Sequence, residues 1–106
     1  MPKHARYYWG KRNGTVRYDF AWDEVRHDSV VLISASEGKP PISTAAPERY
    51  VGDAVFTVLN IAPYDGGVEF GVRIDWDDPL GLWTDITVFD RTDSVYAPPS
   101  RFVNVA

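Results

Sequence analysis

The chain has 106 residues, enough for one domain spanning 1–106 and too few for two stable cores. Hydrophobic residues make up 44% and charged residues 25%, which is a globular composition and excludes a disordered tail. The formal net charge of −4 disfavours a protein that coats nucleic acid or an anionic membrane over its whole surface. Cysteine is absent, so disulfides, thiolate nucleophiles and cysteine-ligated metals are excluded.

The start of the chain bears on location. Residues 1–6 are basic and lead into an aromatic stretch instead of an apolar run of 7–15 residues, so no secretory signal is visible. The longest apolar run, residues 30–33, is far shorter than the about 20 residues of a membrane-spanning helix. We therefore expect a cytoplasmic protein without a membrane segment.

The first predicted element is a hairpin around Asn13-Gly14, a pair favoured in type I′ turns. Residues 15–22 alternate between apolar and polar side chains, as in a strand with one buried face. A two-residue turn predicts that positions summing to 27 pair, with Trp9 opposite Tyr18 and Tyr7 opposite Phe20. The side chains that this register leaves outward are Arg6, Tyr8, Arg12, Arg17 and Asp19.

Further strands are predicted over residues 29–36, 53–62, 67–76 and 82–90, with shorter stretches at 94–97 and 101–105. The β-branched run at 29–36 is typical of a strand buried on both faces. Residues 37–52 form a long proline-containing loop, and a loop of that length is usually functional, mobile or an exchange arm between subunits. No helical periodicity is convincing. The sequence predicts an all-β fold of about six to seven strands, either an antiparallel β-sandwich or a small, partly closed β-barrel.

One segment resembles a known family. Residues 56–61 followed by the turn and strand at 65–70 are similar to the E–F corner of immunoglobulin-like domains, where an Asp-x-Gly turn precedes an aromatic strand. The resemblance covers about a third of the chain. It makes an immunoglobulin-like topology one candidate for the sandwich.

Two tryptophans and several carboxylates flank the predicted connection between the last two main strands. An aromatic face can stack on the apolar side of a sugar ring while carboxylates accept its hydroxyl hydrogen bonds. We expect Trp83 to be the exposed platform, because Trp76 continues the apolar face of its strand. The predicted ligand-binding residues are Trp76, Asp77, Asp78, Trp83 and Asp85, with the 37–52 loop nearby.

A calcium site is the minority alternative, and otherwise no cofactor is expected. Its oxygen ligands would come from Asp75, Asp77, Asp78 and Asp85, although the spacing is not that of an EF-hand. An ordinary hydrophilic turn explains the same residues. No nucleophile–base–acid order, nucleophile elbow or phosphate loop is present, so an enzyme is less favoured than a non-catalytic protein.

Charge is distributed unevenly along the chain. Residues 1–17 carry five basic and no acidic side chains, whereas residues 65–93 carry eight acidic and two basic ones. This asymmetry indicates that the basic segment contacts the acidic one, within one molecule or on a second copy. The predicted interface residues are Arg6, Tyr8, Arg12 and Arg17.

The leading interpretation is a non-catalytic binding module for a polar or carbohydrate-like ligand. The first alternative is a structural protein, a homo-oligomeric virion or shell component, whose tail at 101–106 adds to a neighbouring sheet edge. The second is a small acid–base enzyme such as a glycosidase-like hydrolase. Nucleic acid is not an expected partner, because the acidic surface would repel it.

Overall fold

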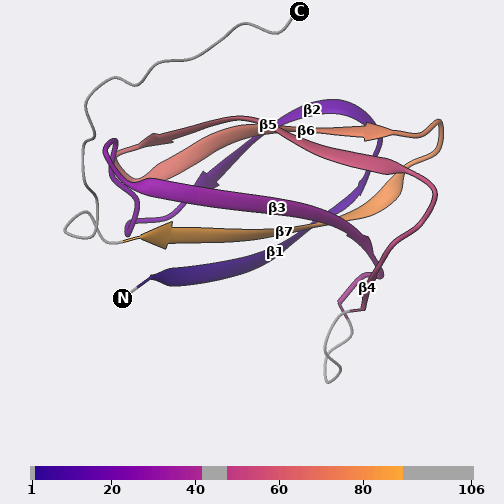
Figure 1. Ribbon diagram of the computed structural model, residues 1–106, viewed down its shortest axis with the longest axis horizontal. Helices are drawn as coiled ribbons and strands as arrows, with labels where there is room; N and C mark the ends of the chain where they lie inside the picture. The colour runs from indigo at the N-terminus through magenta and orange to yellow at the C-terminus, as the bar shows by residue number, and fades with distance from the viewer. Residues whose placement is uncertain (1, 42–47, 90–106) are drawn as a thin grey trace, which may run out of the picture.

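The computed structural model describes residues 2–41 and 48–89, which form seven β-strands and no helix (Figure 1). This confirms the predicted all-β class. Within these residues, no helix is long and apolar enough to cross a membrane. The predicted stretches at 94–97 and 101–106 lie outside the described residues. The strands are β1 (Lys3–Arg12), β2 (Gly14–Ala21), β3 (Val30–Gly38), β4 (Arg49–Tyr50), β5 (Val55–Tyr64), β6 (Gly67–Asp75) and β7 (Leu80–Phe89).

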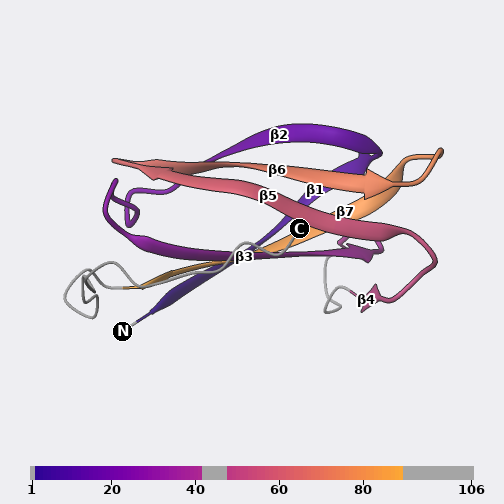
Figure 2. The ribbon, with the colours of Figure 1, turned by 45° about the horizontal axis from the view of Figure 1, so that its top comes forward.

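The strands form two antiparallel sheets that lie one above the other (Figure 2). Sheet A has the order β1-β7-β3-β4, and sheet B has the order β2-β6-β5. In the constant-type immunoglobulin fold the first and second strands are neighbours in one sheet, whereas here β1 and β2 belong to different sheets. The described strands therefore form a sandwich that departs from the constant-type immunoglobulin order at β1, while the neighbours β2-β6-β5 and β7-β3 match strands B-E-D and F-C of that order.

The predicted pairing of β1 with β2 is wrong. β1 pairs with β7 and β2 pairs with β6, so the turn at Asn13-Gly14 carries the chain from one sheet to the other. Gly14 has the positive φ, 69°, that favours glycine at such a turn. The aromatic partners do meet, but across the interior of the sandwich: the rings of Trp9 and Tyr18 are 4.8 Å apart and those of Tyr7 and Phe20 are 5.5 Å apart.

The physical reason is burial. Between the two facing sheets Tyr18 is only 6% exposed and Trp9 and Phe20 pack against the core, whereas Tyr7 stays 46% exposed. The indole N–H of Trp9 donates to Thr84 Oγ1 at 2.8 Å, so this indole donor is satisfied inside the sandwich. The core cluster between the sheets consists of Tyr18, Val25, Val31, Val68, Phe70, Val72, Ile74, Leu82, Ile86 and Val88.

The strand at 29–36 is not buried on both faces. Val31 is buried at 8% exposure, but Val30 and Leu32 are 44% and 57% exposed. These neighbours point to opposite faces of sheet A, because side chains alternate along a strand. The described residues form no further layer over the outer face, so the apolar run of β3 is only half covered.

Candidate functional site

The structure divides the predicted ligand-binding residues between two places. Trp76, Asp77 and Asp78 lie in the connection between β6 and β7, at one end of the sandwich. Trp83 and Asp85 lie along β7, on the outer face of sheet A. Asp85 comes five residues after Leu80, the first residue of β7. At the usual rise of a strand, this places Asp85 about 17 Å along β7 from the β6–β7 connection.

Residues of the β6–β7 connection line a shallow hollow that is open to solvent, here called the loop hollow. Its volume is about 290 Å³, and it is lined by Asp75, Trp76, Asp77 and Asp78. Trp76 is 43% exposed. Asn13 Nδ2 donates to the backbone oxygen of Asp77 at 3.0 Å, which ties the connection to the turn between β1 and β2. In the described part of the chain, none of the three carboxylates forms an ion pair.

Trp83 is not the exposed platform that the sequence predicts. It is only 5% exposed, because the ring of Tyr8 lies 5.1 Å from its own and the chain at Gly38 runs against it. Its indole N–H donates to the backbone oxygen of Lys39 at 2.8 Å. The two tryptophans therefore exchange the roles expected of them: Trp83 packs, and Trp76 is exposed.

Asp85 is held by cationic side chains from two other strands. Arg6 Nε on β1 lies 2.9 Å from one carboxylate oxygen, and Arg49 Nη1 on β4 lies 2.6 Å from the other. His4 Nε2 is 3.5 Å away. This carboxylate therefore lies apart from Asp75, Asp77 and Asp78. Among the residues with described positions, no group of three or more histidines or acids is placed to hold a metal ion.

The predicted interface residues do not share one surface. Arg6 and Tyr8 lie on the outer face of sheet A, where each contacts β7. Arg12 is at the end of β1 and donates to the backbone oxygen of Lys11 at 2.8 Å. Arg17 lies on β2, opposite Gly71 in sheet B. The contact between the basic and acidic segments is present within one molecule, through Arg6 and Asp85.

One carboxyl group has a perturbed pKa outside these places. The backbone N–H of His27 donates to Asp65 Oδ1 at 2.9 Å, and the imidazole Nδ1 lies at the same distance from that oxygen. Both hydrogen bonds lower the pKa of Asp65, because they favour the ionised form. The contact ties the β2–β3 connection to the turn between β5 and β6.

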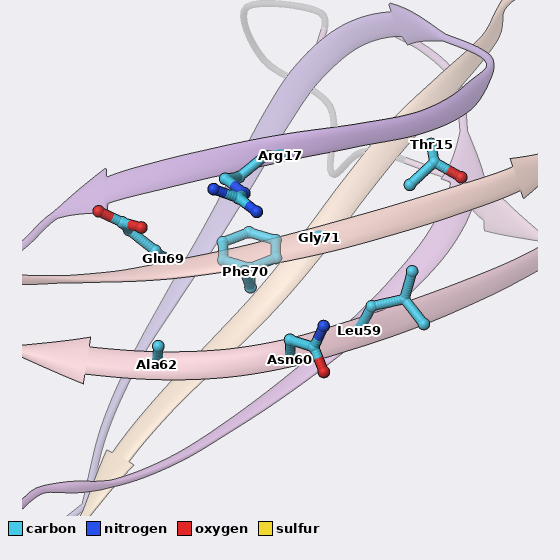
Figure 3. A pocket seen from close by; sticks show the side chains of 8 residues that line it. All are labelled: Thr15, Arg17, Leu59, Asn60, Ala62, Glu69, Phe70 and Gly71. Atoms are coloured by element: carbon cyan, nitrogen blue, oxygen red, sulfur yellow. The ribbon is translucent and has the colours of Figure 1, made fainter.

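A second hollow was missed by the sequence analysis. It lies on the outer face of sheet B, has a volume of about 300 Å³ and surrounds Gly71 (Figure 3). The available signal was a glycine in the middle of an otherwise regular alternating strand. Its lining residues are Thr15, Arg17, Leu59, Asn60, Ala62, Glu69, Phe70 and Gly71.

Comparison with protein-family models, with curated proteins and with solved structures finds no match for this chain. The geometry alone therefore carries the functional proposals.

Proposed function

We propose that the domain is a non-catalytic binding module whose loop hollow takes a polar, carbohydrate-like ligand. The observation that carries the proposal is the exposed indole of Trp76 beside three carboxylates that have no cationic partner among the described residues. In sheet A, by contrast, the carboxylate of Asp85 is occupied by two arginines, whereas the carboxylates of the loop hollow keep free acceptor capacity.

The chemistry of the loop hollow fits a sugar. A tryptophan face covers the apolar C–H side of a pyranose, and carboxylates form charge-assisted hydrogen bonds with hydroxyl groups, which are stronger than neutral ones. The volume of about 290 Å³ is just below the range for small-molecule sites, which runs from about 300 to 1,000 Å³. We therefore expect recognition of one or two sugar units rather than of a long chain.

A glycan array followed by titration of tryptophan fluorescence tests this proposal. We expect a saturable change with a bound glycan, and we expect Trp76→Ala to weaken binding by about tenfold or more, since it removes the stacking surface. Leu32→Ala is the control, because Leu32 on β3 is an exposed apolar side chain that does not line the loop hollow.

Two outcomes would contradict the carbohydrate proposal. One is an array and titrations without any binding, and the other is a glycan whose affinity is the same for Trp76→Ala as for the wild type.

The second candidate function is homo-oligomeric assembly. It is supported by unpaired charges of both signs on the surface: Arg17 and Arg73 have no ion pair within the described residues, nor has the acidic loop hollow. Copies of the chain would pair these charges with one another. Its test is the native mass of the protein at low and high salt.

A further inference from the structure

The Gly71 hollow exists because the central strand of sheet B lacks a side chain at its middle position. In the register of the sheet, Gly71 lies between Arg17 on β2 and Leu59 on β5. Larger side chains surround it on every side, so the missing one leaves a depression in the outer face (Figure 3).

Neither backbone geometry nor packing requires glycine at this position. Gly71 is not among the glycines with positive φ. A Cβ built on it would come no closer than 3.5 Å to another atom, Leu59 Cβ, which is an ordinary contact. Glycine inside a strand costs about 0.5–1 kcal/mol relative to alanine, and it commonly marks a place where another backbone or a ligand approaches closely. The nearest backbone atoms to such a Cβ, Leu59 O at 3.7 Å and Val16 O at 3.8 Å, are at ordinary contact distance, so the space over Gly71 is open to a ligand.

The polar side chains around the hollow have no hydrogen-bond or ion-pair partners among the described residues. Within the described residues, Arg17, Glu69, Asn60 and Thr15 form no side-chain hydrogen bond or ion pair, and Arg17 and Glu69 are not paired with each other. Asn60 has a φ of 50° and stands where the register of β5 shifts between Leu59 and Ala62. Such a bulge turns a side chain away from the regular pattern and is frequent beside binding sites.

Charge also changes sign along the hollow. At one end Glu69 lies directly opposite Asp19, and two carboxylates in this position repel each other. Arg17 lies beside Gly71 in the middle, and Arg73 faces Thr15 two residues farther along the sheet. A ligand with a cationic group at the Glu69 end and an anionic group at the Arg17 end would match this pattern.

We propose that the Gly71 hollow binds a small zwitterion of the α-amino-acid class. The guanidinium of Arg17 takes the carboxylate, since its fork of N–H donors matches two carboxylate oxygens. Glu69 takes the ammonium group, where the charge of Asp19 adds to its attraction. Leu59 and Ala62 form an apolar wall for an aliphatic side chain. The proposal is independent of the loop hollow.

Titration of the ¹⁵N-labelled full chain with L-leucine, followed by NMR, tests the proposal. We expect saturable shifts of the amides of Leu59, Asn60 and Gly71. Acetate and methylammonium each carry only one of the two charges. We expect each to bind at least about tenfold more weakly than L-leucine. Trp76→Ala should bind L-leucine as the wild type does, so failure at one hollow is distinguishable from failure at the other.

Three variants sharpen the test. Arg17→Lys keeps the charge but loses the fork, and it should weaken binding by about tenfold. Gly71→Val should abolish binding by filling the hollow, and Gly71→Ala, whose added Cβ has room, should weaken it in a folded protein. Arg73→Lys is the matched control, because Arg73 is on the same face but does not line the hollow.

The proposal is overturned if L-leucine produces no saturable shift at these amides, or if both Arg17→Lys and Gly71→Ala bind it with wild-type affinity. It is also overturned if the same amides shift with protein concentration instead, because a second copy of the chain then occupies the hollow.

Discussion

Two tyrosine hydroxyl groups stand in opposite environments within the same sandwich. Among the described residues, the buried hydroxyl of Tyr18 has no hydrogen bond of ordinary geometry. Burial raises the pKa of Tyr18 by more than the guanidinium of Arg12, through its charge and as a hydrogen-bond donor, lowers it. The hydroxyl of Tyr64 donates to Asp19 Oδ1 at 2.5 Å, and this hydrogen bond raises the pKa of Tyr64. The first hydroxyl is a cost to the fold, whereas the second joins β2 to β5.

Removing each hydroxyl should therefore have opposite effects. Tyr18→Phe should raise the free energy of unfolding by about 1 kcal/mol, because a buried unsatisfied polar group costs about 1–3 kcal/mol. Tyr64→Phe should lower the free energy of unfolding, since Asp19 loses its donor. Urea denaturation followed by circular dichroism measures both. A loss of stability in Tyr18→Phe would mean that its hydroxyl has a partner in solution.

At the scale of the strands, alternation along the chain predicted the elements better than their pairing. Residues 15–22, 53–62, 67–76 and 82–90 correspond closely to β2, β5, β6 and β7. Alternation records which side chains share a buried face, and that is a local property. The choice of partner is not local: Arg6 pairs with Asp85, 79 residues away along the chain.

The same distinction explains the exchanged tryptophans. Trp83 is buried because β1 brings Tyr8 beside it, and a local pattern does not specify that neighbour. Trp76 is exposed because β6 ends at Asp75, immediately before it. The Gly71 hollow likewise depends on Arg17 and Leu59, from strands that only the sheet brings together.

Asp85 should stabilise the arrangement of three strands in sheet A. Its carboxylate receives Arg6 from β1 and Arg49 from β4, and it is only 24% exposed. Asp85→Asn keeps the size but leaves two arginines without their counter-ion. We expect a loss of about 1–2 kcal/mol in the free energy of unfolding, discounted for partial solvent screening.

Denaturation and hydrogen exchange together check the role of Asp85. Amides of β1 and β4 should exchange faster in Asp85→Asn, while those of sheet B should change little. Asp77→Asn is the control, because Asp77 is exposed and has no ion pair within the described chain. Equal stability of Asp85→Asn and the wild type would show that the three strands do not depend on this carboxylate.

At the scale of the whole molecule, the charge asymmetry along the sequence is not a separation in space. The basic strand β1 lies beside β7, from the acidic part of the chain. The turn between β1 and β2 meets the β6–β7 connection through Asn13 and Asp77. Some of the basic and acidic side chains therefore pair within one chain, as Arg6 does with Asp85. Only the charged side chains that remain unpaired are available for assembly.

The assembly proposal makes a specific prediction about these remaining charges. The native mass measured by light scattering should exceed that of one chain at low salt and fall at high salt, because the Debye length shortens from about 10 Å at 0.1 M to about 3 Å at 1 M. Reversing Arg12 and Arg17 to Glu should lower the mass without unfolding the domain, since both side chains are exposed. Arg17→Lys keeps the charge and should keep the wild-type mass. If the wild type has the mass of one chain at both salt concentrations, copies do not assemble through these charges, and pairs such as Arg6 with Asp85 within the chain account for the asymmetry.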